Sequence, residues 1–133
     1  MRFVIQKHHA SHLHYDLRLE MDGVLRSWAI PKEPPIESGI KKLAIPVEDH
    51  DLSYIDLEKR SVRMDLFEGI IPEGLYGAGT VGIWDKGEYE LLNRNDKKIE
   101  IYLKGNKLKG YYTLIKFKDN WLFFKHLKEA LKA

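Results

Sequence analysis

The sequence contains no cysteine, which excludes both a disulfide framework and a metal site built on thiolates. Any metal ion bound by this chain must therefore use nitrogen and oxygen ligands. The sequence also lacks an apolar run long enough to cross a bilayer, and its first residues turn polar too early for a signal peptide. We therefore expect a soluble, cytoplasmic protein that makes no contact with a membrane.

A strong excess of either charge is absent as well, because the formal net charge is only +2. The charge is nevertheless uneven: residues 1–85 contain ten Lys or Arg against fourteen Asp or Glu, whereas residues 86–133 contain twelve against six. Clustered cations bind polyanions through counterion release, so the C-terminal lysines are candidates for a phosphate-backbone surface, with a solvated surface as the alternative. These lysines are at positions 97, 98, 104, 107, 109, 116, 118, 125, 128 and 132.

The length of 133 residues fits one domain, and we expect residues 1–133 to form a single unit. Hydrophobic residues make up 44% of the chain, and three Trp, seven Tyr and five Phe are available to fill one core.

Residues 13–21 are the most informative segment, because apolar and polar side chains alternate there with period two. Successive side chains of a strand point to opposite faces, so a strand here places His14, Asp16 and Arg18 together on one face. The other face carries only apolar side chains, namely Leu13, Tyr15, Leu17, Leu19 and Met21. One strand is thus predicted to supply both a core face and a site that joins two potential metal ligands to a phosphate-binding cation.

The dipeptide Asp22-Gly23 follows this strand and predicts a two-residue hairpin turn, since Gly readily adopts positive φ. We predict a hairpin over residues 13–30 in which Met21 pairs with Val24, and Arg18 therefore faces Ser27. In this register Asp16 faces Ala29. The small side chains of Ser27 and Ala29 are expected to leave a recess beside the polar face.

The remaining chain reads as short strands joined by turns. Prolines at 31, 34 and 35 predict a loop, a short helix follows over residues 36–42, and a glycine-rich ordered loop is expected over residues 69–82. Strands are predicted at 43–48, 54–57, 61–67, 80–84, 88–92, 98–103, 111–117 and 121–126, with a turn at 93–96. These spacings are typical of an antiparallel barrel or sandwich with little helix.

Four histidines and one aspartate crowd into nine residues, at His8, His9, His12, His14 and Asp16. Two imidazoles and one carboxylate form a three-ligand set with open coordination positions, suited to Mn²⁺, Fe²⁺ or Zn²⁺. His14 and Asp16 share a strand face, and the third ligand must come from another segment, with His8 and His50 as the candidates. His9 and His12 are expected to be ordinary surface histidines.

Arg18 beside this cluster favours phosphate, because its planar guanidinium matches phosphate oxygens in a bidentate manner. Lys32, Lys41 or Lys42 can add point charge, with a solvated side chain as the alternative for each. His50 lies in the acidic stretch Glu48-Asp49-His50-Asp51, where carboxylates can hold it protonated and ready to donate to a leaving oxygen.

Six ordered motifs resemble, at matching spacings over nearly the whole chain, the 3'-phosphoesterase domain of bacterial and archaeal DNA ligase D. The motifs are Gln6-Lys7-His8, Leu13-His14-Tyr15-Asp16-Leu17-Arg18-Leu19-Glu20, Ser27-Trp28-Ala29-Ile30-Pro31-Lys32, Val47-Glu48-Asp49-His50, Pro72-Glu73-Gly74-Leu75-Tyr76-Gly77-Ala78-Gly79 and Trp121-Leu122-Phe123-Phe124-Lys125.

The resemblance implies a mainly β protein, a compact antiparallel β-barrel with one or two short helices. It implies an Mn²⁺-dependent phosphoesterase, with Zn²⁺ or Co²⁺ as other metals for the site, that heals DNA 3' ends in non-homologous end joining. Two reactions are implied: removal of a 3'-terminal ribonucleoside to leave a 3'-phosphate, and hydrolysis of that phosphate to a 3'-hydroxyl. By position, His8, His14 and Asp16 match the metal ligands of the family.

The resemblance also assigns the phosphate-binding and catalytic groups. Arg18, Lys32 and His50 match these groups, and Tyr54 falls at the active-site tyrosine of the family. Lys42 stands where the family commonly has an arginine, which keeps the charge but loses the bidentate fork.

Members fused to a ligase carry an N-terminal arm needed for ribonucleoside removal, and only seven residues precede His8 here. We therefore predict the phosphatase activity for this chain in preference to the nuclease activity. With no ligase or polymerase domain in this sequence, any such partner is expected to act in trans.

Two other function classes fit parts of the sequence. His14, Asp16 and a distant His50 resemble the facial triad of an Fe(II) oxygenase. A non-catalytic nucleic-acid-binding module would instead use the basic C-terminal strands with Tyr111, Tyr112 and Trp121 as exposed aromatic side chains.

Overall fold

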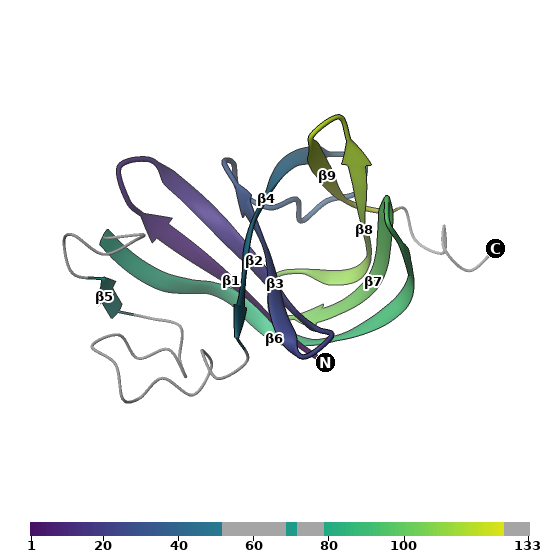
Figure 1. Cartoon of the computed structure of the whole chain (residues 1–133), viewed down its shortest axis with the longest axis horizontal. Coiled ribbons are helices and arrows are strands. Elements are labelled where there is room, and N and C mark those ends of the chain that lie inside the picture. Colours follow the sequence, from purple (N-terminus) through teal and green to yellow (C-terminus); the bar gives the residue numbers. More distant parts are fainter. Residues whose placement is uncertain (52–68, 72–78, 127–133) are drawn as a thin grey trace.

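The computed structural model describes residues 1–51, 69–71 and 79–126, and every regular element in these ranges is a strand (Figure 1). The strands are β1 (Arg2–His9), β2 (Leu13–Met21), β3 (Val24–Ile30), β4 (Lys41–Asp51), β5 (Gly69–Ile71), β6 (Gly79–Asn95), β7 (Lys98–Gly105), β8 (Lys109–Phe117) and β9 (Asn120–Lys125). No helix that could span a membrane occurs in these ranges.

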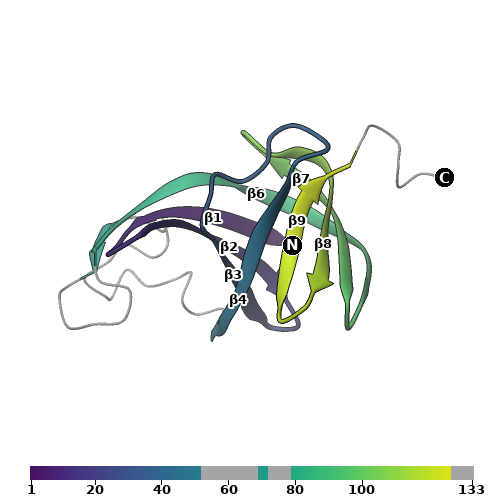
Figure 2. The same cartoon turned by 90° about the horizontal axis from the view of Figure 1, so that it is seen from above.

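The strands form one antiparallel sheet in the order β1-β2-β3-β4-β9-β8-β7-β6-β5, and β1 also pairs with β6. This last pairing closes the eight strands other than β5 into a barrel, which Figure 2 shows from above. β5 pairs with residues 79–81 at the start of β6, whereas β7 pairs with residues 87–95 of the same strand. The compact antiparallel β-barrel predicted above is confirmed.

The predicted β2–β3 hairpin is confirmed residue for residue. Met21 pairs with Val24, Arg18 with Ser27 and Asp16 with Ala29. Asp22 and Gly23 form the turn, with φ of 55° and 78°, a left-handed pair that fits the right-handed twist of the flanking strands.

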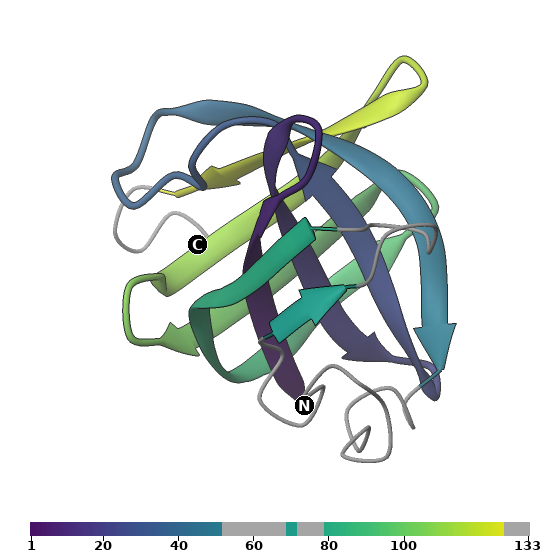
Figure 3. The same ribbon diagram turned by 90° about the vertical axis from the view of Figure 1, so that its left-hand side faces the viewer.

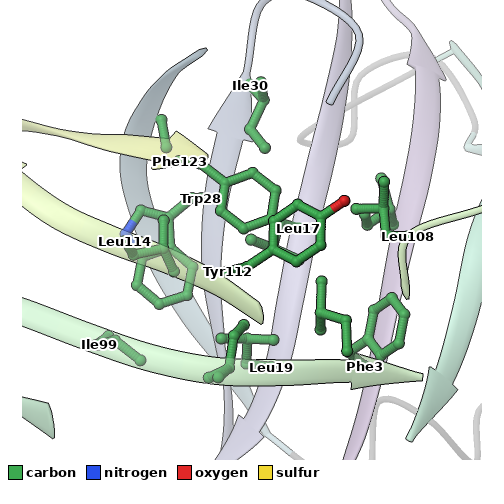
Figure 4. Close-up of a cluster of buried hydrophobic side chains, with 14 of the residues drawn as sticks. Phe3, Leu17, Leu19, Trp28, Ile30, Ile99, Leu108, Tyr112, Leu114 and Phe123 are labelled. Atoms are coloured by element: carbon green, nitrogen blue, oxygen red, sulfur yellow. The ribbon is translucent and has the colours of Figure 1, made fainter. Parts of the chain in front are cut away.

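The core fills the barrel with side chains that alternate along each strand. Figure 4 shows Phe3, Leu19, Tyr112 and Phe123 converging from different sides of the barrel. The hypothesis of a nucleic-acid-binding module requires Tyr112 and Trp121 to be exposed. Tyr112 is instead fully buried and Trp121 is only 4% exposed. Their apolar burial stabilises the barrel instead.

Several local predictions are wrong. The short helix over residues 36–42 is absent: Ser38 forms an isolated bridge with Lys125, and β4 begins at Lys41. The expected loop over residues 69–82 contains β5 and the start of β6. The separate strands at 80–84 and 88–92 are parts of the single strand β6, and β1 was not predicted at all. The strands expected at 54–57 and 61–67 lie outside the described residues.

A buried carboxylate fixes the connection between β7 and β8. Asp85 is 2% exposed and accepts hydrogen bonds from the amides of Asn106 and Leu108, each at 2.8 Å. Gly105 lies directly against Asp85 and Phe3, so that an added Cβ would overlap both side chains. The turn is therefore held from inside the barrel, and glycine is required beside it.

We predict that Gly105→Ala lowers the free energy of unfolding by about 1–3 kcal/mol, because the methyl group overlaps a closely packed buried neighbourhood. Gly82→Ala in the neighbouring strand β6 is the matched control, since an added Cβ there meets nothing within 4 Å. Urea unfolding of both variants checks this, and equal stabilities would contradict the packing argument.

Candidate metal centre

The face of the β1–β2 pair that points away from the core carries the polar site residues. In the register of these strands, His8 pairs with His14 and Gln6 with Asp16, so the four side chains share one face. The turn end of the hairpin that carries them projects from the barrel on the side away from β7, β8 and β9 (Figures 1 and 3). The predicted common face of His14, Asp16 and Arg18 on β2 is thus extended by Gln6 and His8 of β1.

The structure brings His8, His14 and Asp16 together. The carboxylate oxygen Oδ2 of Asp16 lies 3.2 Å from His14 Nε2 and 3.4 Å from His8 Nδ1, and the two imidazole centroids are 4.7 Å apart. One ligand atom from each residue lies within 4.8 Å of the others. Ligands at the usual 2.0–2.2 Å from a transition metal are about 3 Å apart, so this donor set fits one divalent ion.

Backbone contacts orient one of these imidazoles. His14 Nδ1 donates a hydrogen bond to the carbonyl oxygen of His12 at 3.1 Å, which leaves Nε2 directed at Asp16. A ligating histidine commonly has its second nitrogen held in this way, which fixes both the tautomer and the ring orientation. The side chains of His9 and His12 are exposed, as expected for surface histidines.

The electrostatics of the cluster keep Asp16 ionised. Burial alone would raise the pKa of Asp16, but hydrogen bonds from His14 and His8 and the charge of Arg18 hold that pKa well below its usual range. The hydrogen bond with Asp16 raises the pKa of His14 against the opposing effect of burial. Asp16 is therefore a ready oxygen ligand, whereas a proton competes with a metal ion for His14 in acid.

Arg18 is anchored next to this cluster and is only 7% exposed. Its Nε donates to Gln6 Oε1 at 2.8 Å and its Nη1 donates to Ser27 Oγ at 2.9 Å, while its Nη2 lies 3.9 Å from Asp16 Oδ2. The predicted recess at Ser27 is therefore occupied by the guanidinium. A fixed, buried arginine beside the carboxylate supplies positive charge next to the donor set.

Sequence reasoning missed Gln6 as a site residue. It is 2% exposed and, with Ser27, determines where the Arg18 guanidinium lies. The alternation of Gln6 and His8 with Ile5 and Lys7 was the available signal, but the apolar run Phe3-Val4-Ile5 concealed it. Val4 lies on the site face opposite Arg18, and Val81 lies opposite His8, so a buried apolar side chain flanks each of these two site residues.

The other predicted groups are not joined to this cluster by the described contacts. Lys32 is exposed in the connection from β3 to β4. Lys42 pairs with the buried Phe123 and so lies on the core face of the sheet, whereas Lys41 lies on the outer face. The backbone of His50, on β4, pairs with Leu25 of β3, but the His50 side chain, like the whole of Tyr54, lies outside the described residues. The phosphate-binding and catalytic roles predicted for Lys32, Lys42, His50 and Tyr54 stay predictions.

Comparison with known proteins gives a consistent family assignment. Residues 6–116 match the model of the DNA Ligase D 3'-phosphoesterase domain. The chain is 46% identical over 121 residues to the multifunctional non-homologous end joining protein LigD of Pseudomonas aeruginosa, a match covering 87% of this chain and 13% of that protein. It is also 46% identical over 125 residues to the multifunctional non-homologous end joining DNA repair protein LigD of Mycobacterium tuberculosis, covering 90% of this chain and 15% of that protein. The chain thus spans about one seventh of the length of these relatives.

We predict that His8→Ala lowers the affinity for Mn²⁺ or Zn²⁺ by about 100-fold or more, because one of three ligands is lost. The matched control is His9→Ala, which removes an exposed imidazole from the adjacent position of β1 and is expected to leave the affinity unchanged. Isothermal titration calorimetry of the two variants checks this. Equal affinities would exclude His8 as a ligand.

Proposed function

Because the chain belongs to the DNA ligase D 3'-phosphoesterase domain family, we propose that it is a metal-dependent phosphoesterase that processes 3' ends in DNA repair. The observation that carries this proposal is the convergence of His8, His14 and Asp16 within 4.8 Å, with Arg18 fixed beside them. Histidine and carboxylate donors next to a guanidinium match the two needs of phosphate ester hydrolysis, a Lewis acid and a cation for the phosphoryl oxygens.

The metal we propose is Mn²⁺, held by His8 Nδ1, His14 Nε2 and an oxygen of Asp16, with Zn²⁺ and Co²⁺ as other ions that this donor set suits. When bound, such an ion polarises a phosphoryl oxygen and lowers the pKa of a water molecule. Nitrogen and oxygen donors alone are compatible with each of these ions, and the cysteine-free sequence offers no thiolate.

The residues of the chain then position the phosphate. Arg18 binds phosphoryl oxygens with its guanidinium plane held by Gln6 and Ser27, so little side-chain entropy is lost when the phosphate arrives. We propose exposed Lys32 as a source of further positive charge, whereas Lys42, on the core face of the sheet, is assigned to phosphate by the family resemblance alone. As water adds to phosphorus, the bond from phosphorus to the 3' oxygen breaks, and His50 is the group we propose to donate a proton to that oxygen. Tyr54 is the second residue that we propose for catalysis, on the family resemblance.

The preferred reaction in this proposal is removal of a 3'-phosphate, which yields inorganic phosphate and a 3'-hydroxyl. Removal of a 3'-terminal ribonucleoside, which leaves a 3'-phosphate, is the second reaction. The substrate class is therefore a DNA primer-template ending in a 3'-phosphate or in one ribonucleotide, and the 3'-hydroxyl product is the end that a polymerase or ligase requires.

We predict that a primer-template with a 3'-phosphate releases inorganic phosphate in Mn²⁺, and that EDTA, His14→Ala or Asp16→Ala lowers the rate by about 1,000-fold or more, as expected when a metal-activated water is lost. His9→Ala should retain full activity. Gel analysis of the 3' end under anaerobic conditions measures this and also separates the proposal from an Fe(II) oxygenase, whose turnover requires oxygen. Unchanged ends with the wild-type protein would refute the proposed function, and salt-dependent DNA binding alone would favour the non-catalytic module.

We predict that Arg18→Lys raises KM for the 3'-phosphate substrate by about 10-fold or more, because lysine keeps the charge but loses the fork that bonds Gln6 and Ser27. Lys42→Arg is the converse test. It restores the guanidinium fork at the position where arginine is usual in the family, so KM for the 3'-phosphate substrate is expected to fall. An Arg18→Lys variant with unchanged KM and kcat would remove Arg18 from the phosphate site.

A further inference from the structure

The opposite face of the same hairpin carries a second polar feature, which the metal centre does not use. Lys7 Nζ lies 5.9 Å from the centroid of the Tyr15 ring, Tyr15 meets Trp84 edge to face at 5.7 Å, and Lys107 Nζ lies 4.4 Å from the centroid of the Trp84 ring. We call these four residues the cationic rim. Two ammonium groups therefore lie on one connected aromatic platform.

The rim and the metal centre occupy two faces of one end of the β1–β2 hairpin. Lys7 pairs with Tyr15, and the next pair along is His8 with His14. The pairing ends one step later, at His9 and Leu13, so one residue pair and the connection over residues 10–12 lie beyond the site. A strand of nucleic acid that reached the metal centre around this end of the hairpin would pass close to the rim.

Lys107 is presented by a rigid turn. The carboxylate of Asp85 accepts hydrogen bonds from the amides on both sides of Lys107, those of Asn106 and Leu108, and Gly105 N donates to the carbonyl oxygen of Leu108 at 2.9 Å. The backbone amides thus satisfy Asp85, while the Lys107 side chain is exposed. The turn positions the ammonium group without neutralising it.

Among the described residues, no acidic side chain forms an ion pair with either rim lysine. Across the described ranges, Lys7 and Lys107 form no ion pair, whereas Lys98 and Lys104 of the adjacent β7 are paired with Glu100 and Glu90. Cation–π contact accounts for the position of a lysine but leaves its charge uncompensated. Two unbalanced cations beside aromatic rings fit an anionic partner that also offers flat surfaces, and a nucleic-acid strand has both properties.

We propose that the cationic rim binds backbone phosphates of the nucleic-acid strand whose 3' end lies at the metal centre, with Trp84 contacting a base or sugar of that strand. The proposal rests on the proposed function for the identity of the strand. Trp84 is half-buried, in contrast to Trp28 and Trp121, which are 1% and 4% exposed, so it is the tryptophan with surface available for such contact. Lys7 and Lys107 thus act in substrate binding, away from the reacting phosphate.

The first experiment measures binding without turnover. Fluorescence anisotropy with a labelled single-stranded 12-mer bearing a 3'-phosphate, in EDTA, gives Kd as a function of salt. Lys107→Ala is expected to raise Kd about 5- to 10-fold and to reduce the salt slope by about one, as for loss of one phosphate contact. Lys104→Ala removes the same charge from an ion-paired position and is expected to change Kd less than about twofold. Equal Kd values for the two variants would overturn the proposal.

Tryptophan fluorescence gives an independent signal. Binding of the 12-mer is expected to quench emission of the wild-type protein, and Trp84→Phe is expected to abolish most of the quenching while preserving an aromatic ring. Quenching that persists in Trp84→Phe would place the strand away from the rim.

Kinetics separate this inference from the proposed function. Lys107→Ala is expected to raise KM for the 12-mer with kcat unchanged, and to leave hydrolysis of a nucleoside 3'-phosphate unaffected because that substrate has no further backbone. Equal losses of activity on the 12-mer and on the nucleoside 3'-phosphate would indicate damage at the metal centre and would overturn the proposed role of the cationic rim. If the wild-type protein has no activity but Lys107→Ala still weakens binding of the 12-mer, the phosphoesterase function is refuted and the binding role of the cationic rim is retained.

Discussion

The register between β1 and β2 is the constraint on which the rest of the structure depends. It sets His8 opposite His14 and Gln6 opposite Asp16, and on the other face it places Phe3 and Ile5 in the core. A slip by one residue would turn His8 away from Asp16 and expel both core side chains in the same step. The apolar burial that stabilises the barrel therefore also selects the arrangement of the site.

One carboxylate oxygen connects the polar groups on that face. Oδ2 of Asp16 has His14, His8 and the guanidinium of Arg18 within 3.9 Å. Burying an ionised group is unfavourable unless such partners compensate it, and they do so here well enough to hold the pKa of Asp16 below its usual range. Gln6 and Ser27 anchor Arg18 in turn, so the charges remain fixed relative to one another.

Residues 13–30 could be predicted from the sequence because their signals are local. Period-two alternation defines β2, and Asp22-Gly23 fixes the turn and hence the register. The convergence of His8 with this strand could not be derived in the same way, because it depends on the pairing of β1, whose apolar Val4 interrupts the alternation. The family resemblance, not periodicity, singled out His8 over His50.

The errors elsewhere have non-local causes. Residues 36–42 lack a helix because Ser38 and the start of β4 bond to β9 instead. β6 continues through Asp85-Lys86-Gly87, where a break was expected, because β1 pairs with it along this stretch. Backbone hydrogen bonds to strands distant in the sequence override the preference of these residues for turns. Such pairing cannot be predicted from a local sequence pattern.

Closure of the barrel by β1 and β6 also orders the events of folding. Residues 2–9 pair with residues 80–88, so the last seam of the barrel joins segments separated by most of the chain, and contacts of this kind form slowly. Although His8, His14 and Asp16 all lie near the N-terminus, their strand pair gains its second neighbour only when β6 is available. During synthesis, residues 2–9 thus gain this second neighbouring strand only after residues 80–88 have been made.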